Sequence, residues 1–252
     1  MKQAWAAGCG KGMGINMKIL GLDSSGLVAS VAILEDEVLL AEYTTDYKKT
    51  HSQTLLPMLD ELRRMIELDM DTLDAIAIAS GPGSFTGLRI GSATAKGLGL
   101  ALKKPLVEVP TLEALAWNLC GTNKVVCPLM DARRNQVYTA AYEFQSRGEG
   151  FALCTLIPQM PCDIVEMTEK LNELGREVIF LGDGVPVYLK IIREHIRVPY
   201  SLAPAGNNRQ RAASVAALGA VYFAQGRTVA AAEHQPEYLR KSQAEQEALK
   251  KD

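Results

Sequence analysis

The residues that could do chemistry in this chain are few and far apart. Its three histidines, His51, His195 and His234, form neither H-x-x-x-H nor H-E-x-x-H. A zinc peptidase needs two histidines at such a spacing on one helix face, so the sequence argues against a histidine-rich metal site. The five cysteines include no C-x-x-C pair, which is typical of free thiols in a reducing cytoplasm. We therefore expect no bound metal and a cytoplasmic protein.

The most informative stretch is residues 80–91, which read SGPGSFTGLRIG. It joins a predicted buried strand to a predicted helix, where free backbone N–H groups and the helix dipole attract anions. A P-loop continues its last glycine with lysine and a hydroxyl residue, whereas Gly87 is followed by leucine and arginine. Thr86 breaks both the dinucleotide fingerprint and a nucleophile elbow around Ser84. The spacing therefore excludes a P-loop, a dinucleotide-binding loop and a nucleophile elbow. It remains compatible with a loop that is only a structural turn.

Two carboxylates occupy matching positions in the predicted strands. Asp23 and Asp131 each end the first strand of a predicted unit. Paired carboxylates at such strand ends could hold Mg²⁺ through water. An aspartate followed by Ser24 and Ser25 is equally a turn residue that accepts local N–H bonds. Both interpretations stay open at this point.

Two predicted helices, at 50–68 and 87–102, carry more apolar surface than one sheet face can cover. The second has small residues every four positions and apolar residues on both sides. Each interior glycine costs ~1 kcal/mol relative to alanine, so close approach of another backbone is the expected compensation. In the first helix Met58 and Met65 flank the core stripe, and methionine suits adaptable contact surfaces as well as ordinary cores. Together these features predict a two-helix surface for a partner.

The order of predicted elements indicates a duplicated α/β fold. Residues 18–43 predict three antiparallel strands, followed by alternating helix and strand, and residues 124–157 begin the same order again. Neither an all-parallel dinucleotide-binding sheet nor a β/α barrel begins each unit with two hairpins. We predict two mixed-sheet units, 17–121 and 122–240, the second including a C-terminal helix at 208–225. A flexible extension (1–16) and a charged tail (241–252) flank them.

Composition limits the classes of partner. The 252 residues are 48% hydrophobic with a net charge of −2, and a chain of this length buries roughly three quarters of its unfolded surface without metals or disulfides. No apolar run approaches the ~18 residues that cross a membrane, so we expect no membrane partner. The chain lacks the basic excess with which nucleic-acid binders neutralise phosphates. We expect any RNA to be held mostly by another component.

Eight short stretches, spread from Met17 to about Arg240, carry a family resemblance. They are residues 19–25, 50–53, 56–57, 80–91, 131–133, 137–138, 182–184 and 236–240. In this order they resemble the TsaB family, formerly YeaZ, of the actin/Hsp70/sugar-kinase (ASKHA) superfamily, whose fold is actin-like and RNase H-like. Gln136 departs from the family pattern, which usually has glutamate before Val-Tyr.

The resemblance implies a role in making threonylcarbamoyladenosine (t6A37) beside the tRNA anticodon. It implies a non-catalytic subunit that pairs with a TsaD-type paralogue and a TsaE-type ATPase, contacts tRNA only through the complex, and forms a homodimer when alone. ATP and Mg²⁺ are expected on the partner subunits, with no cofactor tightly bound here.

The resemblance also implies two sets of site residues. The expected partner surface comprises His51, Leu55, Met58, Leu62, Met65, Ser84, Phe85, Arg89, Gly91, Ala95, Leu98 and Leu102. Charging it at Met58 and Leu98 is expected to abolish complex formation while the monomer stays folded. A vestigial nucleotide site would comprise Asp23, Ser24, Ser25, Asp131, Gly182 and Gly184.

Two other functions stay open. A stand-alone ATP-binding protein or small-molecule kinase of the same fold would use Asp23 and Asp131. A peptidase would need the metal cluster or nucleophile elbow that the spacing excludes.

Overall fold

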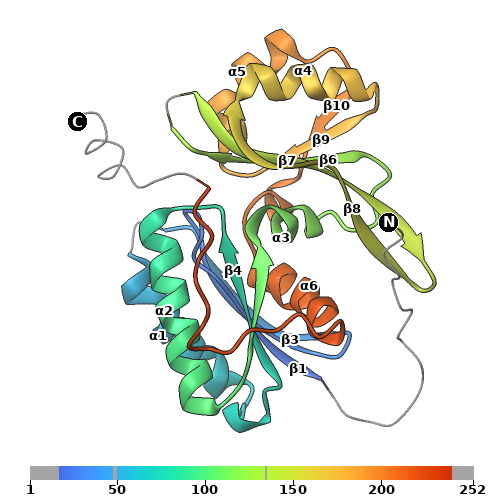
Figure 1. Cartoon of the computed structure of the whole chain (residues 1–252). Helices are drawn as coiled ribbons and strands as arrows, with labels where there is room; N and C mark the ends of the chain where they lie inside the picture. The colour runs from blue at the N-terminus through green and yellow to red at the C-terminus, as the bar shows by residue number, and fades with distance from the viewer. Residues whose placement is uncertain (1–16, 48–49, 134, 240–252) are drawn as a thin grey trace.

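A computed structural model describes residues 17–47, 50–133 and 135–239. The predicted extension at 1–16 and tail at 241–252 lie outside the described residues. Figure 1 shows two α/β units, each built around a five-stranded sheet.

The first sheet has the strand order β3-β2-β1-β4-β5. Its strands are β1 (Lys18–Asp23), β2 (Ala29–Glu35), β3 (Val38–Thr45), β4 (Ala75–Gly81) and β5 (Leu106–Pro110). The first three pair antiparallel, and β4 and β5 run parallel to β1. Strands β1 and β4 are buried on both faces, which explains their nearly continuous apolar sequence.

The second sheet repeats this topology with the order β10-β9-β6-β7-β8. Its strands are β6 (Val125–Asp131), β7 (Gln136–Arg147), β8 (Gly150–Asp163), β9 (Val178–Leu181) and β10 (Tyr200–Leu202). Antiparallel pairing joins β6, β7 and β8, and parallel pairing joins β6, β9 and β10. The repeat confirms the predicted duplicated α/β fold with two mixed sheets, which is the actin-like, RNase H-like topology.

Helices fill the faces of the sheets. On one face of the first sheet, α1 (His51–Met65) and α2 (Phe85–Leu102) share a core with the side chains of Leu20, Leu22 and Ile76. In the second unit, α4 (Ile164–Leu174) and α5 (Gly184–His195) pack against the sheet. The short α3 (Thr111–Trp117) contacts strands of both sheets.

The C-terminal helix corrects the predicted division of the chain. We expected it within the second unit, but α6 (Ala212–Ala224) packs on the first sheet, against β1, β2 and β4. Close approach explains this placement: a Cβ at Gly21 would lie 2.3 Å from the carbonyl oxygen of Ala212, and one at Gly219 2.5 Å from the Cβ of Ala77. The chain therefore returns to the first unit to cover its open face.

Candidate partner-binding site

The turn between β1 and β2 holds the starts of both α1 and α2. Ser24 Oγ donates to the carbonyl oxygen of Gly87 over 2.9 Å. The carbonyl oxygen of Ser25 accepts from the N–H of Ser84 at 2.7 Å, and that of Gly26 accepts from His51 Nε2 at 2.8 Å. Ser84 is the N-cap of α2, and His51 is the first residue of α1. Both helices therefore begin in hydrogen-bonded contact with the same turn.

The glycines of α2 serve this chain's own packing. A Cβ at Gly87 would lie 2.1 Å from the carbonyl oxygen of Ser24, and one at Gly91 would lie 2.4 Å from Ser24 Oγ. At Gly99 it would meet Ala231 at 2.7 Å, whereas Gly97 has nothing within 4 Å. The expected close approach of another backbone is confirmed at Gly87, where that backbone belongs to this chain's own β1–β2 turn, whereas Gly97 faces open space.

Seven of the twelve residues of the predicted partner surface pack into the first unit. Leu55, Met58, Leu62 and Ala95 are buried in the core shared by α1, α2 and the sheet. Leu98 and Leu102 are half-buried against the same core, and Gly91 is buried against Ser24. Because Met58 faces inward, an arginine there would place a charge in the core. Charging Met58 and Leu98 would therefore disturb the fold and cannot test partner binding.

The outward faces of the helices present a different, smaller apolar surface. Met65 is 76% exposed, Ser84 and Arg89 are exposed, and His51 and Phe85 are half-buried. Sequence reasoning missed Leu56 and Leu100, which are 52% and 58% exposed. Leu56 and Met65 are nine residues apart, which at ~100° per residue puts them on opposite flanks of α1. We call the following residues the α1–α2 surface: Leu56, Thr86, Arg89, Ile90, Ala93, Gly97, Leu100 and Ala101. The signal that could have found it was the helical spacing of α2's small residues opposite its buried stripe.

The segment that follows α6 runs back along α2 (Figure 1). Val229 pairs with Leu106, and Lys96 Nζ donates to the carbonyl oxygen of His234 over 3.1 Å. Farther on, the ring of Tyr238 lies 4.9 Å from that of Phe85, and the guanidinium of Arg89 lies 4.1 Å from the centroid of the Phe85 ring. The segment thus borders the α1–α2 surface.

The predicted nucleotide residues are engaged within their own units. Asp23 is 1% exposed and accepts two bonds from Ser25, at 2.8 and 2.6 Å. Burial raises the pKa of Asp23 to about 6, against the opposing effects of those bonds and of His51. Asp131 is exposed and accepts from the Tyr188 hydroxyl at 2.7 Å. The two carboxylates therefore sit in different environments.

The predicted glycines of this site, Gly182 and Gly184, lie beside β6. A Cβ at these positions would lie 2.1 and 3.1 Å from the carbonyl oxygen of Leu129. Their small size is needed for packing against that strand.

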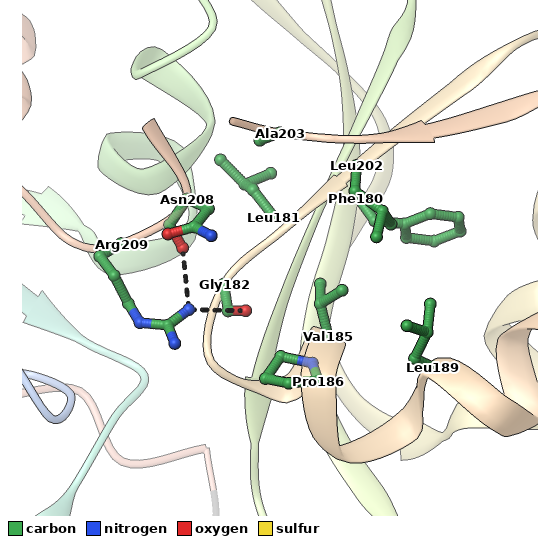
Figure 2. A pocket seen from close by; sticks show the side chains of 10 residues that line it. All are labelled: Phe180, Leu181, Gly182, Val185, Pro186, Leu189, Leu202, Ala203, Asn208 and Arg209. Carbon is green, nitrogen blue, oxygen red and sulfur yellow. Dashed lines mark hydrogen bonds between the residues drawn. The ribbon is translucent and has the colours of Figure 1, made fainter. Parts of the chain in front are cut away.

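A cavity of about 230 Å³ opens beside Gly182 (Figure 2). Its lining is mainly apolar, with Phe180, Val185 and Leu189 on one side and Arg209 on the other. Arg209 Nη1 donates to the carbonyl oxygens of Gly182 and Asn208, at 3.3 and 3.4 Å. The volume is below the roughly 300–1,000 Å³ of typical ligand pockets.

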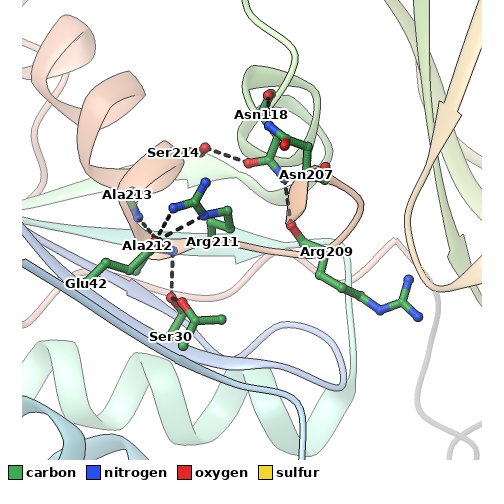
Figure 3. A network of polar contacts seen from close by, with 10 residues as sticks. Ser30, Glu42, Asn118, Asn207, Arg209, Arg211, Ala212, Ala213 and Ser214 are labelled. Carbon is green, nitrogen blue, oxygen red and sulfur yellow. Dashed lines mark hydrogen bonds and ion pairs between the residues drawn. The ribbon is translucent and has the colours of Figure 1, made fainter. Parts of the chain in front are cut away.

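A polar network ties the link between the units to the first unit (Figure 3). Asn118 Nδ2 donates to the carbonyl oxygen of Arg209 at 2.6 Å, and its Oδ1 accepts from Ser214 Oγ at 2.6 Å. Arg211 pairs with Glu42, and the N–H of Ala212 donates to Ser30 Oγ. The arrangement fixes the chain as it passes from the second sheet into α6.

Within the described ranges, no three histidine, cysteine or acidic side chains gather as candidate metal ligands. None of the helices in that part of the chain has the length and apolar character to cross a membrane.

Comparison with known proteins identifies the family. Residues 38–248 match the family model described as TsaD: tRNA N6-adenosine threonylcarbamoyltransferase. The tRNA threonylcarbamoyladenosine biosynthesis protein TsaB of Bacillus subtilis (strain 168) is 32% identical over 203 residues, covering 81% of this chain and 87% of that protein. TsaB of Escherichia coli (strain K12) is 31% identical over 234 residues, covering 90% and 96%. The structure of YeaZ from Pseudomonas aeruginosa aligns with a TM-score of 0.70 at 27% identity, over 88% of this chain and 100% of that one. This chain belongs to the TsaB (YeaZ) family.

Proposed function

We propose that this chain is a non-catalytic subunit of the machinery that makes threonylcarbamoyladenosine beside the tRNA anticodon. Relatives that share 31–32% of their residues over most of this chain carry that biosynthetic name. The environments of the two aspartates at the expected nucleotide site also favour a non-catalytic role. Asp23 is sealed against its own turn, and Asp131 is engaged by Tyr188.

The chain docks a TsaD-type paralogue through the α1–α2 surface. The observation that carries this proposal is that two neighbouring helices expose apolar and small residues while their opposite faces fill the core. Ala93, Gly97 and Ala101 lie on the outward stripe of α2, where small side chains let another helix approach closely. In this arrangement ATP and Mg²⁺ belong to the partners, a TsaE-type ATPase joins them, and tRNA is held through the complex. The same surface forms a homodimer when the chain is alone.

The test is threonylcarbamoyladenosine formation on tRNA by the remaining purified components, with and without this chain. We expect the modification only when the chain is present. The double variant Leu56→Arg with Leu100→Arg should lose TsaD binding while keeping its fold, because both side chains are exposed. Val187→Arg is the matched control, since Val187 is 57% exposed on α5 of the second unit. Full modification without the chain, or intact binding by the folded double variant, contradicts the proposal.

A stand-alone ATP-binding protein or kinase is the second candidate. Its support is the duplicated fold, since the cavity beside Gly182 and Arg209 is smaller than typical ligand pockets and mainly apolar. Isothermal titration of the isolated chain with ATP and Mg²⁺ separates the two functions, because tight binding by the chain alone is expected only of the second.

A further inference from the structure

Asp23 is a buried carboxylate, and its surroundings disfavour the charged form of the group. It ends β1, is 1% exposed, and lies in an environment where desolvation raises its pKa. Removing a carboxylate from water is costly, and strongly perturbed carboxyl groups gather at functional sites. Its two hydrogen bonds both come from Ser25, from the N–H at 2.8 Å and from Oγ at 2.6 Å. The carboxyl group therefore sets the shape of the turn that follows it.

That turn reaches both helices of the α1–α2 surface through three consecutive residues. Ser24 bonds Gly87 in the first turn of α2, Ser25 bonds the α2 N-cap Ser84, and Gly26 bonds His51 at the start of α1. The turn packs tightly against the residues that precede α2, because a Cβ at Gly83 would lie 2.3 Å from the carbonyl oxygen of Ser25. A change in the turn must consequently move the helix starts.

We infer that Asp23 is a positioning residue for partner binding: its carboxyl oxygen holds the 24–26 turn, which sets the first turns of α1 and α2 against each other. The inference rests on the proposed function of the α1–α2 surface. The role requires a hydrogen-bond acceptor at Oδ1 and not a negative charge. A role in holding Mg²⁺ with a nucleotide would instead require the charge.

Two substitutions at Asp23 separate these requirements. Asp23→Ala removes the acceptor, and we expect about a tenfold or greater loss of affinity for the purified TsaD-type paralogue, because two buried donors of Ser25 lose their partner. Asp23→Asn keeps an oxygen acceptor and should bind within about threefold of the unsubstituted chain. Affinity is measured by isothermal titration, and hydrogen exchange of residues 51–54 and 84–91 is measured in the chain alone.

Asp163→Ala is the matched control. Asp163 also accepts from the backbone N–H two residues ahead, that of Val165, at 2.8 Å, but it caps α4 of the second unit. It should leave affinity and exchange at 51–54 and 84–91 unchanged. If Asp23→Ala fails to fold, Ser25→Ala removes only the Oγ bond and should give a smaller effect in the same direction.

The outcomes distinguish this inference from the proposed function. If the unsubstituted chain does not bind the paralogue, the proposed function fails, and faster exchange at both helix starts in Asp23→Ala still decides whether Asp23 positions them. Unchanged exchange and affinity in Asp23→Ala overturn the inference. A loss in Asp23→Asn as large as in Asp23→Ala also overturns it, because the charge would then be the requirement.

Discussion

Ser24 donates a hydrogen bond to the carbonyl oxygen of Gly87 over 2.9 Å, and the backbone of Ser24 occupies the space that a side chain at Gly87 would need. A residue 63 positions earlier in the chain thus explains why position 87, in the first turn of α2, is a glycine. The partner that the glycine spacing suggested is, at this end of the helix, the protein's own β1–β2 turn.

This contact predicts opposite effects for alanine at two glycines of one helix. Gly87→Ala should lower the free energy of unfolding by about 1–3 kcal/mol, because the new Cβ meets backbone that cannot easily move. Gly97→Ala should raise it by about 0.5–1 kcal/mol, because the site is open and alanine favours the helix. Urea denaturation of both variants measures the two changes. Equal effects at the two positions would contradict the packing described for α2.

The contact between Phe85 and Tyr238 predicts a second effect. Tyr238→Ala should destabilise the fold by about 1 kcal/mol, since the ring pair at 4.9 Å is lost. It should also speed hydrogen exchange from residue 234 to 239, where the segment lies along α2. Tyr47→Ala is the control, because Tyr47 is highly exposed. Unchanged exchange in the Tyr238 variant would show that the segment is held by its other contacts alone.

Local patterns predicted the elements but not the faces that they bury. Apolar runs between glycine and proline residues are local signals, so both three-strand meanders were predictable. Met58 was assigned to a partner because apolar spacing on a helix is the same whether it faces the chain's own sheet or another protein. The helix at 212–224 was assigned to the wrong unit for a related reason: its packing on Gly21 depends on a contact almost 200 residues away. Leu56 and Leu100 emerge only once the buried faces are known.

The network around Asn118 predicts a third effect, on the joint between the units. Asn118→Ala should lower the free energy of unfolding by about 1–3 kcal/mol, because the carbonyl oxygens of Asn207 and Arg209 lose their donor. Gln145→Ala is the control, since the side chain of Gln145 is exposed and bonds Glu143 at the surface. Thermal unfolding measures the stability of both variants. Equal stability would show that the Asn118 network does not stabilise the joint between the units.

Asp23 predicts how stability depends on pH. Its pKa, raised by burial from the ordinary 3.8 to about 6, means that the folded chain binds this proton more tightly than the unfolded chain does. The stabilisation from the protonated form is therefore complete below pH 3.8 and is lost as the pH rises through about 6.

Asp23→Asn removes that dependence while keeping the acceptor for Ser25. At pH 7.5 the variant should be more stable than the unsubstituted chain by up to about 3 kcal/mol, and at pH 4.5 the difference should shrink to about 1 kcal/mol or less. Urea denaturation at the two pH values measures it, with Asp163→Asn as the control because Asp163 is exposed. A difference that does not grow with pH would mean that the Asp23 carboxyl is not held in the buried environment described here.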